Sequence, residues 1–277
     1  RGIQPMTEMF CRSTAVRLAY RDEGGGPPVV MIHGVGSALD SWDGVLERLS
    51  PARRYIRFDL RGHGGSARTP GPYSLDDFVE DTVALMDQLA VDRAAIVGFS
   101  LGGLIAQGFA LAHPERVSAL ALISTVAGRT AEEQARVQAR AETLATDGAV
   151  GHLANAVERW FTDEFRAAHP EVLEARRRKS LLNDPDCYVA AYRVLAGTDL
   201  GSQLPRVVAP TLVMTGENDV GSTARMARFI HEHIEGSELH ILPDLKHSVL
   251  LEAPDQVGNR VERFLAAHLD STSGRDG

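Results

Sequence analysis

The sequence predicts an α/β fold: a mostly parallel central sheet with helices on both faces and an inserted helical cap. Short runs rich in β-branched residues alternate with longer helical patterns, as in a parallel sheet that is covered on both sides. One long charged stretch without strand signals interrupts this alternation. The 277 residues, 44% hydrophobic and 24% charged, are also enough to bury a full core.

Six strands are predicted from apolar runs that end at turn-forming residues. They cover residues 28–32, 55–59, 94–98, 117–123, 210–214 and 238–242. Helical spacing of apolar residues predicts four helices between and after them. These cover residues 41–49, 75–89, 101–113 and 254–269. Ser74 is the predicted N-cap of the second helix, because Asp76 and Asp77 stand in its first turn.

The stretch from Thr125 to about Leu204 is charged and helical, and it stands between two predicted strands of one sheet. Such an insertion is most simply a cap over the carboxyl ends of the strands. We therefore expect residues 1–124 and 205–277 to form the core and residues 125–204 to form the cap. The basic run at 176–179 is expected to be a solvated helix face.

A candidate nucleophile stands at the sharpest predicted turn. Gly98-Phe99-Ser100-Leu101-Gly102 fits the pattern G-x-S-x-G, with an apolar strand before it and a helical pattern after it. In that context the serine sits on a strained strand-to-helix turn with its hydroxyl exposed at the top of the sheet. Small residues at Gly98, Gly102 and Gly103 allow the strand and the helix to approach closely.

A serine hydroxyl needs a base, and the base in turn needs an acid that orients it. In this arrangement the partners follow the serine in the order acid, then histidine. His247 lies between the last predicted strand and the last helix, where the base is expected. The preceding strand is followed by two carboxylates. Asp219 is preferred because it lies further into the loop, and Glu217 is the alternative.

The developing negative charge of the transition state needs two hydrogen-bond donors. The backbone N–H of Leu101, directly after the nucleophile, is the first candidate. The second is the N–H of Val35, because a His-Gly pair at residues 33 and 34 ends the first predicted strand.

These motifs together resemble the α/β-hydrolase superfamily. The resemblance covers residues 16–265 and rests on His33-Gly34, the segment 59–66, the segment 98–103, the segment 216–219 and His247. Within it, the insertion is similar to the cap of 3-oxoadipate enol-lactonases, through segments 159–162, 169–170, 184–188 and 199–200. The sequence departs from that family at Val220-Gly221-Ser222, where Thr-Pro is usual.

The resemblance implies a serine hydrolase that cleaves a small ester or lactone through an acyl-enzyme. It also implies that Arg159 contacts a substrate carboxylate and that Trp160 forms a pocket wall. A serine at the turn points to attack on a carbonyl carbon. Two alternatives stay open at this stage: hydrolysis of a carbon–carbon bond in a dienone or diketone by the same residues, or a ligand-binding protein without activity.

Charge and composition narrow the expected partners. A net charge of −8 disfavours nucleic acid, and no apolar stretch approaches the roughly 18 residues that span a membrane. The first residues lack the apolar run of a signal peptide, and the only cysteines, Cys11 and Cys187, stand far apart. We expect a cytoplasmic monomer or homodimer without disulfides, with a frayed tail at 271–277.

Two short patterns resemble a cofactor site and a metal site, but neither has the structural context that such a site needs. Gly62-His63-Gly64-Gly65-Ser66-Ala67 fits a dinucleotide-binding fingerprint, yet the polar residues after it do not open a helix. His231 and His233 stand two positions apart on a helix, so they point in different directions. We expect neither a cofactor nor a metal.

Overall fold

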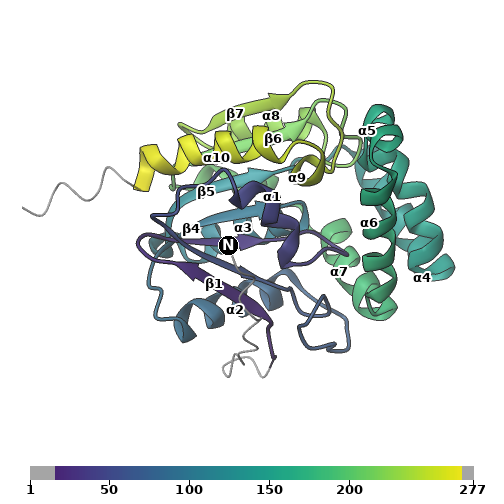
Figure 1. The fold of residues 1–277 in the computed structure, drawn as a ribbon, viewed down its shortest axis with the longest axis horizontal. Coiled ribbons are helices and arrows are strands. Elements are labelled where there is room, and N and C mark those ends of the chain that lie inside the picture. The colour runs from purple at the N-terminus through teal and green to yellow at the C-terminus, as the bar shows by residue number, and fades with distance from the viewer. Residues whose placement is uncertain (1–15, 270–277) are drawn as a thin grey trace, which may run out of the picture.

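A seven-stranded sheet runs through the middle of the molecule (Figure 1). The computed structural model describes residues 16–269, and of residues 147–155 the backbone alone; Cys11 and the tail 271–277 lie outside the described residues. The strands are β1 (Tyr20–Gly24), β2 (Pro28–Ile32), β3 (Arg54–Phe58), β4 (Ala94–Phe99), β5 (Val117–Ile123), β6 (Thr211–Gly216) and β7 (Glu238–Leu242). Their order is β1-β3-β2-β4-β5-β6-β7, and β1 alone among them pairs antiparallel. The predicted fold class is confirmed.

The edge strand β1 is the one strand that the sequence pattern did not predict. Of its five residues only Tyr20 is buried, and the rest are polar or glycine, so no apolar run marks it. An edge strand pairs with one neighbour and needs little apolar surface. Here Asp22 accepts two hydrogen bonds from the guanidinium of Arg54 on the neighbouring strand, at 2.9 and 2.7 Å.

Helices cover both faces of the sheet, and the alternation along β2 shows why. Val30 and Ile32 belong to one apolar cluster, whereas Val29 and Met31 belong to the other. The first cluster includes side chains of α2 (Leu75–Gln88), α3 (Leu101–Ala112) and α8 (Ala224–His233), and the second includes those of α1 (Asp43–Leu46), α9 (Val249–Glu252) and α10 (Pro254–Leu269). Three short 3-10 helices connect these elements: Leu39–Trp42, Pro114–Arg116 and Gly201–Arg206.

The structure confirms the predicted start of one helix and corrects the predicted extent of another. Ser74 caps α2 as expected, because its side chain accepts from the N–H of Asp77 while the Asp77 carboxylate accepts from the N–H of Ser74. The predicted helix 41–49 is wrong in extent. A 3-10 turn occupies Leu39–Trp42, and the α-helical part that follows is only four residues long.

The insertion between β5 and β6 contains helices joined by short irregular segments and no strand, and its α-helices gather at one end of the sheet (Figure 1, right). They are α4 (Ala131–Trp160), α5 (Asp163–Ala168), α6 (Pro170–Leu182) and α7 (Pro185–Gly197). Val137, Ala141 and Leu144 of α4 form an apolar cluster with Tyr188 and Tyr192 of α7. The exact division of the chain into core and cap stays a prediction. Among residues 16–269 no helix is both long enough and apolar enough to cross a membrane.

Candidate active site

Ser100 occupies a strained turn between β4 and α3. Its backbone has φ 55° and ψ −116°, a region that costs a non-glycine residue about 1–3 kcal/mol. The glycines around it are sterically required. A Cβ on Gly98 would lie 2.2 Å from the carbonyl oxygen of Gly102, and a Cβ on Gly102 would lie 2.0 Å from that of Ile32. The close approach of strand and helix therefore holds this turn in one conformation.

His247 is held by a buried carboxylate. Its Nδ1 lies 2.6 Å from Oδ2 of Asp219, whose side chain is only 1% exposed. The other oxygen of Asp219 accepts hydrogen bonds from the backbone N–H groups of Gly221 and Ser222, at 2.8 and 2.9 Å. Glu217, the alternative acid, is exposed and accepts from the N–H of Asp244 instead. The structure thus pairs the histidine with Asp219.

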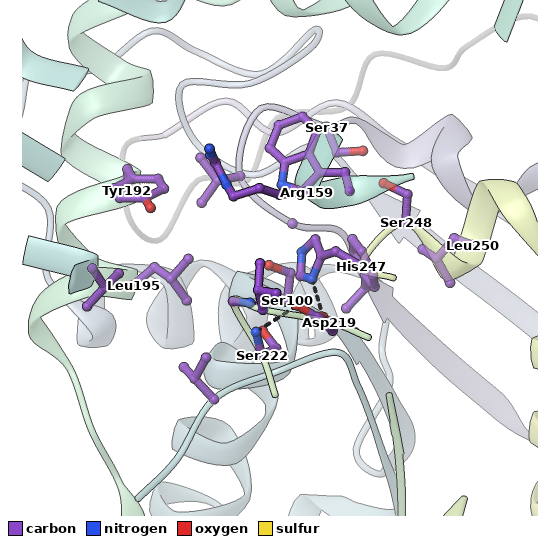
Figure 2. Close-up of a pocket in the computed structure, with 18 of the residues that line it drawn as sticks. Ser37, Ser100, Arg159, Tyr192, Leu195, Asp219, Ser222, His247, Ser248 and Leu250 are labelled. Carbon is purple, nitrogen blue, oxygen red and sulfur yellow. Dashed lines mark hydrogen bonds and ion pairs between the residues drawn. The ribbon is translucent and has the colours of Figure 1, made fainter. Parts of the chain in front are cut away.

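Ser100, Asp219 and His247 line one pocket, to which β4, β6 and β7 each bring a residue just beyond their carboxyl ends. Figure 2 shows the three side chains grouped together, with Arg159 and Tyr192 above them in that view. The loop that carries His247 is tied to the end of α4, because the N–H of Ser248 donates to the carbonyl oxygen of Trp160 at 2.9 Å.

Of the two residues predicted to supply oxyanion donors, Leu101 directly follows the serine and Val35 lines the same pocket. Leu101 is the first residue of α3, so its N–H has no acceptor within the helix. Val35 lines the pocket, and its neighbour Gly34 is so near that a Cβ added there would lie 3.0 Å from Cβ of Ser100.

The loop around Gly34 is positioned by a buried neutral histidine. His33 Nε2 accepts from the N–H of Leu60 at 3.0 Å, so Nδ1 carries the proton and donates to the carbonyl oxygen of Gly34 at 2.8 Å. Burial lowers the pKa of His33 to about 4, and burial followed by the charge of His33 lowers the pKa of His63 to about 4. The ring centroids of the two histidines are 5.4 Å apart.

The side of the pocket opposite the serine is formed by the inserted helices. Arg159 and Trp160 line it, where the resemblance placed them. The prediction of a solvated face at 176–179 is wrong for Arg176, which also lines the pocket. The NH1 group of Arg176 donates to the carbonyl oxygen of Gly36 at 2.6 Å. Its guanidinium lies 5.4 Å from the ring centre of Trp160. Arg177, Arg178 and Lys179 are exposed, as that prediction expected; the two arginines pair with Glu174, and Lys179 pairs with Asp40.

Sequence reasoning missed several other residues of this wall. They are Arg129, Arg140, Tyr188 and Tyr192. Arg140 carries a signal that could have found it: it follows Val137 by three positions and precedes Leu144 by four, so it shares their apolar face of α4. A charged residue on an apolar helix face needs a reason, and here it faces a pocket.

No metal site is built from the residues that the structure describes, since no three His, Cys, Asp or Glu side chains gather to hold an ion. His231 and His233 contact separate oxygens, the hydroxyl of Ser237 and the backbone carbonyl of Phe229.

Comparison with known proteins agrees with this architecture. A sequence model of the alpha/beta hydrolase fold matches residues 27–254. The chain is 30% identical to 3-oxoadipate enol-lactonase 2 of Acinetobacter baylyi over 257 residues, 93% of this chain and 95% of the relative. It is 30% identical to (E)-2-((N-methylformamido)methylene)succinate hydrolase of the same organism over 253 residues, 89% of this chain and 93% of the relative.

A solved structure, the enol-lactonase from Burkholderia xenovorans LB400, matches with a TM-score of 0.84 and 29% identity, over 91% of this chain and 97% of that one. The resemblance predicted from the motifs is confirmed by these matches. The chain belongs to the α/β-hydrolase fold family.

Proposed function

We propose that this chain is a serine hydrolase that cleaves a small ester or lactone through an acyl-enzyme. The observation that carries the proposal is the 2.6 Å hydrogen bond between His247 and the buried Asp219, in the pocket that Ser100 also lines. A carboxylate at Nδ1 keeps the proton on that nitrogen and leaves Nε2 free to act as a base.

In the proposed reaction, His247 Nε2 takes the proton of the Ser100 hydroxyl while Oγ bonds to the substrate carbonyl carbon. The carbonyl oxygen becomes an oxyanion, which the N–H groups of Leu101 and Val35 stabilise. The carbon–oxygen bond to the leaving alkoxide then breaks, and His247 gives the proton to that oxygen. Water attacks the acyl-enzyme in the same way and releases the acid. Asp219 stabilises the imidazolium form of His247 in both halves.

An enol-lactone is the first substrate class to assay, because enol-lactonases are among the relatives over nearly the whole chain. The same residues also suit hydrolysis of a carbon–carbon bond next to a carbonyl. Parallel assays on an enol-lactone and on a dienone separate these two reactions. If the protein turned over the dienone alone, the proposed reaction would be carbon–carbon bond hydrolysis in place of ester or lactone cleavage.

Replacement of Ser100 by alanine tests the proposal, because it removes the hydroxyl and leaves Cβ in place. We expect turnover of p-nitrophenyl acetate to fall by about 10⁵-fold or more, and labelling by a fluorophosphonate probe to disappear. Ser118→Ala, on strand β5 outside the pocket lining, serves as the matched control and should keep full activity. Near-normal turnover in Ser100→Ala would contradict the mechanism. A folded wild-type protein that is neither labelled nor active would indicate a binding protein instead.

A further inference from the structure

The wall of the pocket carries much more positive charge than the reaction itself needs. Four arginines line the pocket, and Asp219 is the only carboxylate among the described residues that do so. The four are Arg129, Arg140, Arg159 and Arg176. Asp219 is already engaged by His247, so it does not balance them.

One of the four has a structural role. Arg129 donates to the carbonyl oxygens of Leu195 and Thr198, at 2.7 and 3.0 Å. These bonds join the start of the insertion to the end of α7. Arg129 therefore stabilises the fold, and the other three guanidinium groups are the candidates for binding a ligand.

Arg140 and Arg159 both belong to α4, and both line the pocket. Burial lowers the pKa of Arg159, and the charge of Arg140 lowers it next. Arg140 forms no ion pair with a described residue, and its buried Nε has no hydrogen-bond partner among them. A buried donor without a partner and like charges around one pocket both cost free energy, which a bound anion would offset.

Arg176 is a second cationic group, on a different helix. Its NH1 donates to the carbonyl oxygen of Gly36 at 2.6 Å and to the hydroxyl of Ser180 at 3.2 Å. These neutral oxygens orient the guanidinium and leave its charge in place. Burial lowers the pKa of Arg176, and the nearby Tyr188 and Asp40 raise it. The wall thus presents positive charge from two different helices, α4 and α6.

We propose that the substrate carries two carboxylates besides the bond that is cleaved, one bound by Arg140 with Arg159 and the other by Arg176. A guanidinium presents parallel donors that match the two oxygens of a carboxylate, so each group can recognise one carboxylate directly. The cleavage step of this inference rests on the proposed function. The binding step does not, because it involves residues of the wall alone.

Binding to the Ser100→Ala variant tests the inference without any turnover. Titration calorimetry at low ionic strength compares glutarate with pentanoate, which has the same number of carbons and one carboxylate. We expect glutarate to bind at least about tenfold more tightly, and this advantage to shrink with added salt. Equal affinity of the two acids would overturn the inference, while the hydrolase proposal would still stand on the Ser100→Ala activity assay.

Arginine variants in the same background locate the two groups. In Arg140→Gln and in Arg176→Gln, glutarate is expected to lose its advantage over pentanoate. Arg136→Gln on α4 and Arg178→Gln on α6 are matched controls, because both side chains are exposed and pair with Glu132 and Glu174. Controls that weaken glutarate binding as much as the two test variants would show a general charge effect and contradict a specific site.

Discussion

The two sides of the pocket differ in what fixes their side chains. The pocket floor consists of Gly34, Val35, Ser100, Asp219 and His247, all from the sheet-bearing part of the chain. Main-chain features hold it: a strained φ at Ser100, glycines that no Cβ could replace without a clash, and backbone N–H groups on Asp219. Only one arrangement satisfies all of these at once.

The pocket wall, made of Arg140, Arg159, Trp160, Arg176, Tyr188 and Tyr192, depends on long side chains of three helices. It meets the floor through backbone atoms, at the carbonyl oxygens of Gly36 and Trp160. From this comparison we expect main-chain geometry to set the proposed chemistry and the exchangeable side chains of the wall to set the choice of substrate.

The largest effect is expected from Asp219→Asn, which keeps the shape of the floor and changes one atom. The amide can donate to His247 Nδ1, which would move the histidine proton to Nε2 and remove the base. We expect kcat to fall about 10³- to 10⁴-fold with little change in KM. Glu217→Gln, in the same loop but exposed, is the control and should stay near wild type. Equal losses in the two variants would contradict the assignment of Asp219 as the acid that orients His247.

The next effect concerns stability, and it tests the buried histidines behind the floor, of which His33 donates to the carbonyl oxygen of Gly34. His33 and His63 have a folded pKa of about 4, below the unfolded value of about 6.5, so the unfolded chain takes up the proton first. Their contribution is complete above about pH 6.5 and is lost as the pH falls toward 4. At pH 5 each histidine is expected to have reduced the free energy of unfolding by about 2 kcal/mol relative to pH 7.

Urea denaturation at pH 7 and pH 5 measures this difference. His63→Asn should reduce the loss between the two pH values by about 2 kcal/mol, since it removes one of the two groups. His169→Asn, an exposed histidine at the start of α6, should leave the loss unchanged. If both variants behaved alike, the buried histidines would not be the source of the pH dependence.

The smallest effect is expected from Gly221, whose N–H is one of the two donors to Asp219. Gly221→Pro removes that N–H, because proline has no backbone N–H to donate. We expect kcat to fall about tenfold, the value of one charge-assisted hydrogen bond. Gly221→Ala keeps the donor and adds a Cβ that would lie 3.5 Å from Asp219 Oδ1, an ordinary contact, so it should retain activity. A larger loss in the alanine variant would point to backbone strain.

Much of this molecule could be predicted from local patterns. The six predicted strands and the last helix agree with the structure to within two residues, because buried strands and amphipathic helices leave short periodic signals. The turn at Ser100 was predictable for the same reason, since its glycines stand next to it in the chain. The polar edge strand β1 carries no such signal and was missed.

Only the tertiary structure determined which residues from distant segments of the chain contact one another. Two carboxylates follow β6 within three residues, and the sequence favoured Asp219 while leaving Glu217 as an alternative. The hydrogen bond to His247 singles out Asp219. Arg176 looked like part of a solvated basic run, although it reaches Gly36, which lies 140 positions earlier in the chain. Local patterns determine which elements form and where a strained turn must lie. Which faces of separate helices converge depends on packing, and packing is a property of the whole chain.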